Sequence, residues 1–375
     1  MSRSRDVGAQ RRGGGTVPEA GSDAGSDPSS GAGSASRTAH EVVGLYGDPD
    51  TTWGIFLELG LNVPTQVDAV RRGLADLVAA HPHLGPAPEP EQATEAAWDE
   101  RLQHLAAAPY DGNGPLVRVL LGPGKVVVAA HHGVCDGLGL LAIAEAATGL
   151  ELRSQAKGIG DRPAPVGFLR SSLSRLTEAL LRPPPRFASH VVDPSPREHL
   201  EILSVPRRAV GSVDLALAVA QVFAAWNAAG SERPLLVAGA SRREPGASAP
   251  DRQTAYLRFR VDPRWTREQA RAAFAAVEPE PEFPETSARG IGPRVTRLLR
   301  NRLGGTAQIS NLGVVESPGL EYAAMFPALS GPRALAVGLV TTSTSTSLSL
   351  RTRGSEFSAA DTRELAGLIA AALTD

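Results

Sequence analysis

The sequence predicts an α/β (α+β) fold built from two similar lobes. Its 375 residues, 42% of them hydrophobic, are enough for one large domain or for two lobes with substantial cores. Both halves mix short β-type runs with apolar residues at helical spacing, although no repeat is visible residue by residue. Between the halves, residues 166–200 carry two proline clusters, at 183–185 and 194–196, that cannot continue regular structure. We therefore expect an inter-lobe linker at 166–200.

The first lobe is expected at residues 40–165. Residues 1–39 are rich in Gly and Ser and poor in large apolar residues, so they are expected to form a disordered tail. The expected helix 67–78 ends before Pro82, because proline disfavours the α conformation in the residue that precedes it. A turn at Gly122-Pro123-Gly124 predicts a hairpin. The expected strands are 52–59, 115–121 and 125–130, and the expected helices are 67–78, 92–107 and 138–147.

The second lobe is expected at residues 201–375. Its clearest helix, 213–229, has Ser212 available as N-cap and Gly230 as its C-terminal stop. A last helix is expected at 359–373. The expected strands are 200–205, 234–240, 254–261, 306–312, 334–340 and 345–353.

Composition excludes several classes of function. A net charge of −2 indicates no basic face, so nucleic acid is not an expected partner. Cys135 is the only cysteine, which excludes an internal disulfide and a cysteine-based zinc cluster, and no metal site is expected. The N-terminus lacks the apolar core of a signal peptide, and the apolar stretch 213–229 is too short and too polar to span a bilayer. We expect a soluble cytoplasmic protein without a membrane partner.

Two histidines at a strand end, His131 and His132, are followed at fixed spacing by Asp136 and Gly137. A strand end holds a side chain rigidly, and the alternation of a strand sends the two imidazoles to opposite faces, so only one should face a given cavity. Imidazole can remove a proton from a hydroxyl or an amine at neutral pH. The aspartate can hold the turn through an ion pair, and the glycine leaves space for an approaching group.

Plainer interpretations compete with each candidate. Adjacent histidines are usually structural, and Cys135, beside a turn, is expected to pack rather than to act as a nucleophile. His81 and His83 lack acidic or cysteine companions and are expected to lie at a helix end on the surface. The glycines at 137 and 139 match a dinucleotide-binding pattern, but no second strand ending in an acid follows them. No nucleotide site is expected.

The segment His131-His132-Gly133-Val134-Cys135-Asp136-Gly137 resembles the HHxxxDG motif of the acyltransferase superfamily that includes chloramphenicol acetyltransferases and peptide-synthetase condensation domains. Residues 74–84, 110–118 and 308–313 are similar to further family segments in the expected order. The resemblance covers roughly residue 40 to the C-terminus.

The resemblance implies two mixed sheets with helices that meet at a central tunnel. His132 would be the catalytic base in mid-tunnel, His131, Asp136 and Gly137 would be structural, and Ser310 and Asn311 would lie on the segment that crosses between the lobes. The reaction implied is acyl transfer from a thioester to a hydroxyl or amine of a small-molecule acceptor, in nonribosomal peptide or polyketide biosynthesis. The donor would be acyl-CoA or acyl-phosphopantetheine on a carrier protein bound in trans to a free-standing enzyme, and no cofactor would be bound permanently.

The sequence also departs from the family pattern. Condensation domains commonly carry arginines at the positions of Ala80 and Gly85, the first of which pairs with the motif aspartate. Arg118, on a neighbouring strand, is a candidate replacement as the partner of Asp136. Two alternatives stay open: a non-catalytic scaffold that recruits a carrier protein, and an enzyme that uses His132 for hydrolysis, cyclisation or elimination.

Overall fold

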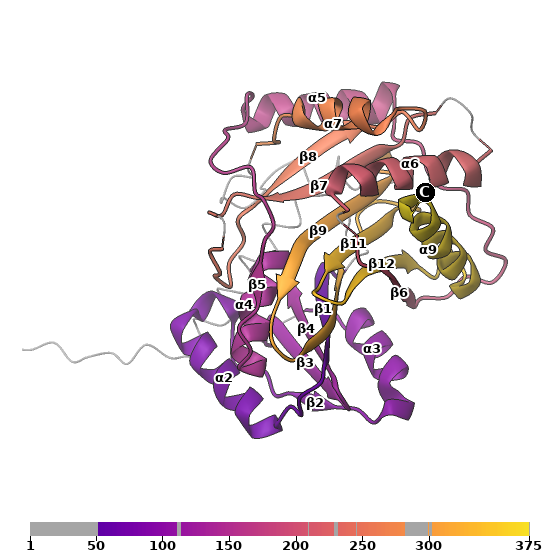
Figure 1. Cartoon of the computed structure of the whole chain (residues 1–375). Helices are drawn as coiled ribbons and strands as arrows, with labels where there is room; N and C mark the ends of the chain where they lie inside the picture. Colours follow the sequence, from indigo (N-terminus) through magenta and orange to yellow (C-terminus); the bar gives the residue numbers. More distant parts are fainter. Residues whose placement is uncertain are drawn as a thin grey trace, which may run out of the picture.

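The computed structural model describes residues 52–110, 114–208, 210–228, 232–244, 246–281, 299 and 302–374. The expected tail at 1–39 and the expected helix stop at Gly230 lie outside these residues. Two sheets, each with its own helices, form two lobes, which confirms the predicted α/β fold (Figure 1). None of the described helices combines the length and the apolarity that a membrane crossing requires.

The sheet of the first lobe has the strand order β10-β1-β4-β3-β2. β1 pairs antiparallel with both of its neighbours, and β3 and β4 form the hairpin expected at the Gly-Pro-Gly turn. The bounds are β1 Gly54–Leu61, β2 Glu91–Gln92, β3 Val117–Gly122, β4 Lys125–His131 and β10 Leu320–Phe326.

Helices cover both faces of this sheet, because successive side chains of β1 point to opposite sides. Figure 1 shows α2 (Val67–Ala80) and α4 (Gly137–Thr148) on one side and α3 (Trp98–Ala107) on the other. Leu57 packs in the core cluster under α2 and α4, whereas its neighbour Phe56 packs with α3. Two 3-10 helices, η1 (Pro82–Leu84) and η2 (Glu95–Ala97), follow α2 and precede α3.

The sheet of the second lobe has the strand order β6-β12-β11-β9-β7-β8, with β5 paired to the end of β9. β9 runs parallel to β11 and β7, and the remaining pairs are antiparallel. The bounds are β5 Arg153–Ser154, β6 Glu198–Pro206, β7 Leu235–Ser241, β8 Thr254–Arg260, β9 Ala307–Glu316, β11 Leu335–Thr341 and β12 Ser345–Arg353.

Four of the described helices accompany the second sheet. The core of this lobe forms between the sheet and α6 (Ser212–Trp226) and α9 (Ala359–Thr374). In Figure 1, α5 (Phe168–Leu181) and α7 (Arg267–Ala275) lie beyond β8 at the top. The N-cap of α6 is Gly211 rather than the expected Ser212, and the Asp214 carboxylate accepts from the Gly211 amide at 2.8 Å.

The structure corrects the expected division of the chain in two places. Residues 166–200 are not a continuous irregular linker, because α5 and the first residues of β6 lie within them. Residues 201–375 are not a self-contained lobe, because β10 leaves the second lobe and forms an edge of the first sheet. The two lobes are therefore joined by a strand as well as by the chain between them.

Candidate functional site

His132 lies directly after β4, between the two lobes. Its backbone amide donates to the carbonyl of Trp53 at 2.8 Å, which fixes the residue against the start of β1. The imidazole Nδ1 lies 3.1 Å from the Cys135 carbonyl oxygen, and Nε2 lies 2.7 Å from the Tyr256 hydroxyl. Because a carbonyl only accepts, Nδ1 carries the proton, and the Nε2 lone pair accepts from the phenol.

His132 is only 6% exposed, and burial lowers the pKa of its imidazole from the ordinary value. The Arg252 charge lowers this pKa as well, while the bond to the Cys135 carbonyl and the Asp136 charge raise it. Burial is the largest of these causes. The ring is therefore neutral near pH 7, which is the state in which an imidazole can accept a proton.

His131, the last residue of β4, is fully buried away from the cavity that His132 lines. Its Nδ1 accepts from the Gly133 amide at 3.1 Å, and its ring meets Tyr110 edge-on with centroids 5.5 Å apart. Strand alternation thus separates the two imidazoles, as expected from the sequence.

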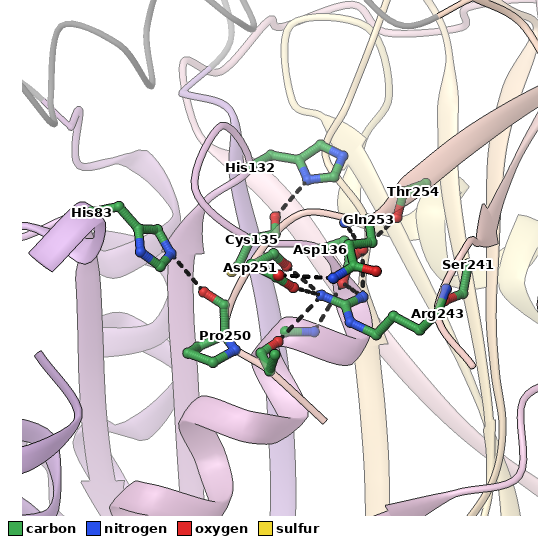
Figure 2. Close-up of polar contacts among 12 residues, drawn as sticks. His83, His132, Cys135, Asp136, Ser241, Arg243, Pro250, Asp251, Gln253 and Thr254 are labelled. Carbon is green, nitrogen blue, oxygen red and sulfur yellow. Dashed lines mark hydrogen bonds and ion pairs between the residues drawn. The ribbon is translucent and has the colours of Figure 1, made fainter. Parts of the chain in front are cut away.

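Asp136 caps the N-terminus of α4 and collects five hydrogen bonds (Figure 2). Within the first lobe, its Oδ1 accepts from the Gly139 amide at 2.9 Å. From the second lobe, Arg243 Nη1 reaches both carboxylate oxygens at 2.6 and 2.7 Å, and Oδ2 also accepts from the Gln253 amide and the Thr254 hydroxyl at 2.9 and 2.8 Å. The side chains of Asp136 and Arg243 are 3% and 1% exposed, so this is a buried ion pair between the lobes.

The prediction that Arg118 pairs with Asp136 is therefore wrong. Its guanidinium donates to the Ala108 carbonyl at 2.7 Å and to the Pro109 carbonyl, and it lies 4.0 Å over the Tyr110 ring. These contacts hold Arg118 against the segment that follows α3. Asp136 instead pairs with Arg243, which lies 107 residues after Asp136 in the sequence.

The connection between β7 and β8 docks onto the first lobe around this ion pair. Arg243 Nη2 donates to the carbonyl and the carboxylate of Asp251, and the Asp251 carbonyl accepts from the Asp136 amide at 3.2 Å. Ser248 donates to Glu145 of α4 at 3.0 Å. His83, expected at the surface, is exposed, and its Nε2 lies 2.8 Å from the Pro250 carbonyl oxygen (Figure 2). This histidine therefore joins the lobes.

The alternative chemistries at the motif lack space or reactivity. A Cβ at Gly139 would lie 2.6 Å from the Asp251 carbonyl oxygen, so this helix N-terminus is filled by the protein's own chain and leaves no room for a dinucleotide. Cys135 is fully buried, and burial raises the pKa of its thiol well above the ordinary value. Within the described ranges, no cluster of three or more His, Cys, Asp or Glu side chains is placed to hold a metal ion.

A cavity of about 120 Å³ lies between the lobes beside His132. Gly137 lines it, and a Cβ there would lie 2.8 Å from Leu312 Cδ2 and 3.2 Å from Met325 Cε. Ser310 and Asn311 of β9 line it as well, on the strand that precedes the crossing strand β10. A second cavity, of about 220 Å³, adjoins the first. The residues that line both cavities are Leu138, Ala156 and Ser241.

Two residues of the site, Arg243 and Tyr256, were not predicted from the sequence. Thirty-six of the 38 cationic residues are arginine, so nothing marks Arg243 among them. Tyr256 lies on a strand that was expected, but only the pairing of the lobes brings it to His132. Both contacts join residues that are far apart in the sequence, so the spacing of a local motif cannot predict them.

Solved structures with the same fold share little sequence with this chain. A variant of the starter condensation domain of rhizomide synthetase RzmA, in complex with C8-CoA and Leu-SNAC, matches with a TM-score of 0.53 and 13% identity, over 92% of this chain and 94% of that one. The EpoB NRPS cyclization-docking bidomain from Sorangium cellulosum gives 0.53 and 14%, over 89% and 82%. The condensation domain of the Monacolin K polyketide synthase MokA gives 0.51 and 12%, over 91% and 95%.

No family model and no curated protein matches the sequence. The chain nevertheless has the two-lobed fold of these condensation domains, over almost its whole length. At the level of the fold, the resemblance inferred from the sequence is confirmed.

Proposed function

We propose that this protein is an acyltransferase that moves an acyl group from a thioester to a hydroxyl or an amine, with His132 as the base. The observation that carries the proposal is the imidazole itself, which lines the cavity between the lobes with Nδ1 anchored on a carbonyl and Nε2 turned toward the second lobe. This is the tautomer that can accept a proton at Nε2.

The proposed reaction needs a base and an attacking atom. The hydroxyl oxygen or amine nitrogen of the acyl acceptor attacks the thioester carbonyl while His132 Nε2 takes the proton of that hydroxyl or amine. The carbon–oxygen or carbon–nitrogen bond forms, the carbon–sulfur bond breaks, and the imidazolium returns the proton to the departing thiolate. No redox step and no permanently bound cofactor is needed.

The donor is proposed to be acyl-CoA or an acyl-phosphopantetheine arm on a carrier protein that binds in trans to the free-standing enzyme. The RzmA domain, which shares the fold, is known in complex with C8-CoA, and this supports a thioester donor of that kind. A role in nonribosomal peptide or polyketide biosynthesis follows from the same likeness and forms part of the proposal. In this proposal Asp136 and His131 fix the position of His132, and Gly137 adds no side chain to the wall of the cavity where Leu312 and Met325 already pack.

The test uses octanoyl-CoA and octanoyl-loaded carrier protein with a panel of small amines and alcohols, and detects products and deacylated carrier by mass spectrometry. Replacing a positioned base removes about 10²–10⁴-fold of rate, so His132→Ala should lose turnover by that factor while the melting curve is retained. The matched control is His104→Ala, which alters an exposed histidine on α3. Near-native activity of His132→Ala would refute the proposal. Release of octanoate with every acceptor would identify hydrolysis instead.

A further inference from the structure

The proton-accepting nitrogen of His132 is already occupied in the protein without substrate. Tyr256, on β8 of the second lobe, places its hydroxyl 2.7 Å from Nε2, with the two rings nearly perpendicular at 87°. The strand holds Tyr256 in register opposite Gly239 of β7, and both residues line the cavity. The contact therefore spans the two lobes at the point where the acceptor would react.

The direction of this hydrogen bond follows from the other side of the ring. Nδ1 lies 3.1 Å from the Cys135 carbonyl, which can only accept, so the ring proton is on Nδ1. Nε2 then offers one lone pair, and the Tyr256 hydroxyl donates to it. An acceptor's O–H or N–H must donate to that same lone pair before its proton can be removed. The phenol and the acceptor thus exclude each other.

We propose that Tyr256 is a gate on the base: its hydroxyl holds Nε2 of His132 until the hydroxyl or amine of the acceptor displaces it. The inference rests on the proposed function, in which Nε2 is the proton acceptor. An imidazole with a free lone pair could activate water and hydrolyse the donor thioester before the acceptor arrives. With the phenol in place, the base is withheld from water.

Other groups also act on this imidazole. Cys135 and Asp136 act on it from the turn before α4, and Arg252 from the connection between β7 and β8. Lys157 lines the same cavity. A donor to Nε2 stabilises the neutral ring, so its removal should raise the pKa of His132. A test that changes only the hydroxyl of Tyr256 leaves the other groups in place.

The first measurement uses protein labelled with ¹⁵N-histidine, in which the His132 signals are assigned through their loss in His132→Gln. Tyr256→Phe should shift the Nε2 resonance and raise the pKa of His132. The matched control is Tyr322→Phe, which removes a hydroxyl bonded to Glu58 at 2.6 Å and should leave the His132 signals unchanged. Unchanged His132 signals in Tyr256→Phe would overturn the proposal.

The second measurement follows free thiol release from octanoyl-CoA without an acceptor. Tyr256→Phe should hydrolyse it faster than the parent by about 2–10-fold, the range that the net contribution of one neutral hydrogen bond allows. The double variant Tyr256→Phe/His132→Ala should lose this increase. An unchanged or slower rate in Tyr256→Phe would overturn the gate.

The gate and the proposed function can fail separately: unchanged hydrolysis in Tyr256→Phe overturns the gate alone, as long as His132→Ala still loses acyl transfer. If the ¹⁵N signals shift as expected but the faster hydrolysis persists without His132, the contact exists while His132 is not the base. In that case both the gate and the proposed role of His132 fall. Shifted signals together with His132-dependent hydrolysis support the gate even before an acceptor is identified.

Discussion

Removing Arg243 should loosen the contact between the lobes more than any surface ion pair could. The substitution Arg243→Met keeps most of the side-chain length but leaves the Asp136 carboxylate, 3% exposed, without its cationic partner. The carboxylate keeps three neutral donors, from Gly139, Gln253 and Thr254. These partly compensate for the loss, yet they do not neutralise the charge.

The expected magnitude follows from the burial of the pair. Breaking a buried ion pair by removing one partner costs about 3–5 kcal/mol, and the three remaining donors place this case near the lower end, at about 3 kcal/mol. Unfolding entropy is about 2.1 cal/mol/K per residue, or about 0.6 kcal/mol/K for the roughly 300 described residues. A cost of about 3 kcal/mol then corresponds to a fall in melting temperature of about 5 °C.

The assay is thermal unfolding of the parent, Arg243→Met, Asp136→Asn and the double variant. Because each single change leaves a buried partner behind, the double variant should be less destabilised than the sum of the two. The matched control is Arg153→Met, which breaks a pair with Glu151 whose side chains are 77% and 64% exposed, and should shift the melting temperature by no more than about 1 °C.

Arg243→Met should also disturb His132, the proposed base. Asp136 follows Cys135, whose carbonyl holds Nδ1 of His132, so release of the carboxylate should broaden or shift the ¹⁵N signals of that ring. A variant Arg243→Met that melts within about a degree of the parent, with unchanged His132 signals, would refute the reasoning that the pair carries both the lobe contact and the site.

Two further predictions concern Glu58 and Gly137. Burial raises the pKa of the Glu58 carboxyl, so its contribution to stability is full below the ordinary glutamate pKa and is lost as the pH rises through the raised value in the folded protein. Glu58→Gln should therefore gain stability relative to the parent between about pH 4 and pH 7 in denaturant titrations, and a pH-independent difference would contradict this. At Gly137, alanine needs only a small shift of the side-chain ends of Leu312 and Met325, whereas leucine must displace both further or project into the cavity that Gly137 lines. Gly137→Ala should keep transfer and Gly137→Leu should lose it while melting within a few degrees of the parent, and equal activity of the two would contradict this.

The sequence was sufficient to predict the features that depend on interactions between residues close together in the chain. Period-two alternation separates His131 from His132, and the glycines at 122 and 124 turn one strand into the next within a few residues. Asp136 was expected to hold the turn, and as N-cap of α4 it does so. In each case the interacting groups lie within a few residues of one another.

What the sequence could not provide depends on contacts between distant segments. Arg118 was a reasonable partner for Asp136 because it lies on an adjacent part of the sheet, but two carbonyls after α3 hold it there. Arg243 and Tyr256 reach the site only because the connection between β7 and β8 crosses to the first lobe. Helix α5 was not predicted, because the prolines that follow it led to the prediction of a linker over the whole of residues 166–200.

The strand exchanged between the lobes has a consequence for synthesis on the ribosome. β1 has no partner on one side until β10 arrives, and all eight of its residues are buried in the finished protein. While residues up to about 320 are being made, the nascent first half therefore presents an open apolar edge, the kind of edge that recruits other chains. Expressed alone, residues 40–200 should aggregate, and a separate peptide spanning β10 should restore their solubility. The first lobe can be completed only when most of the second has been made.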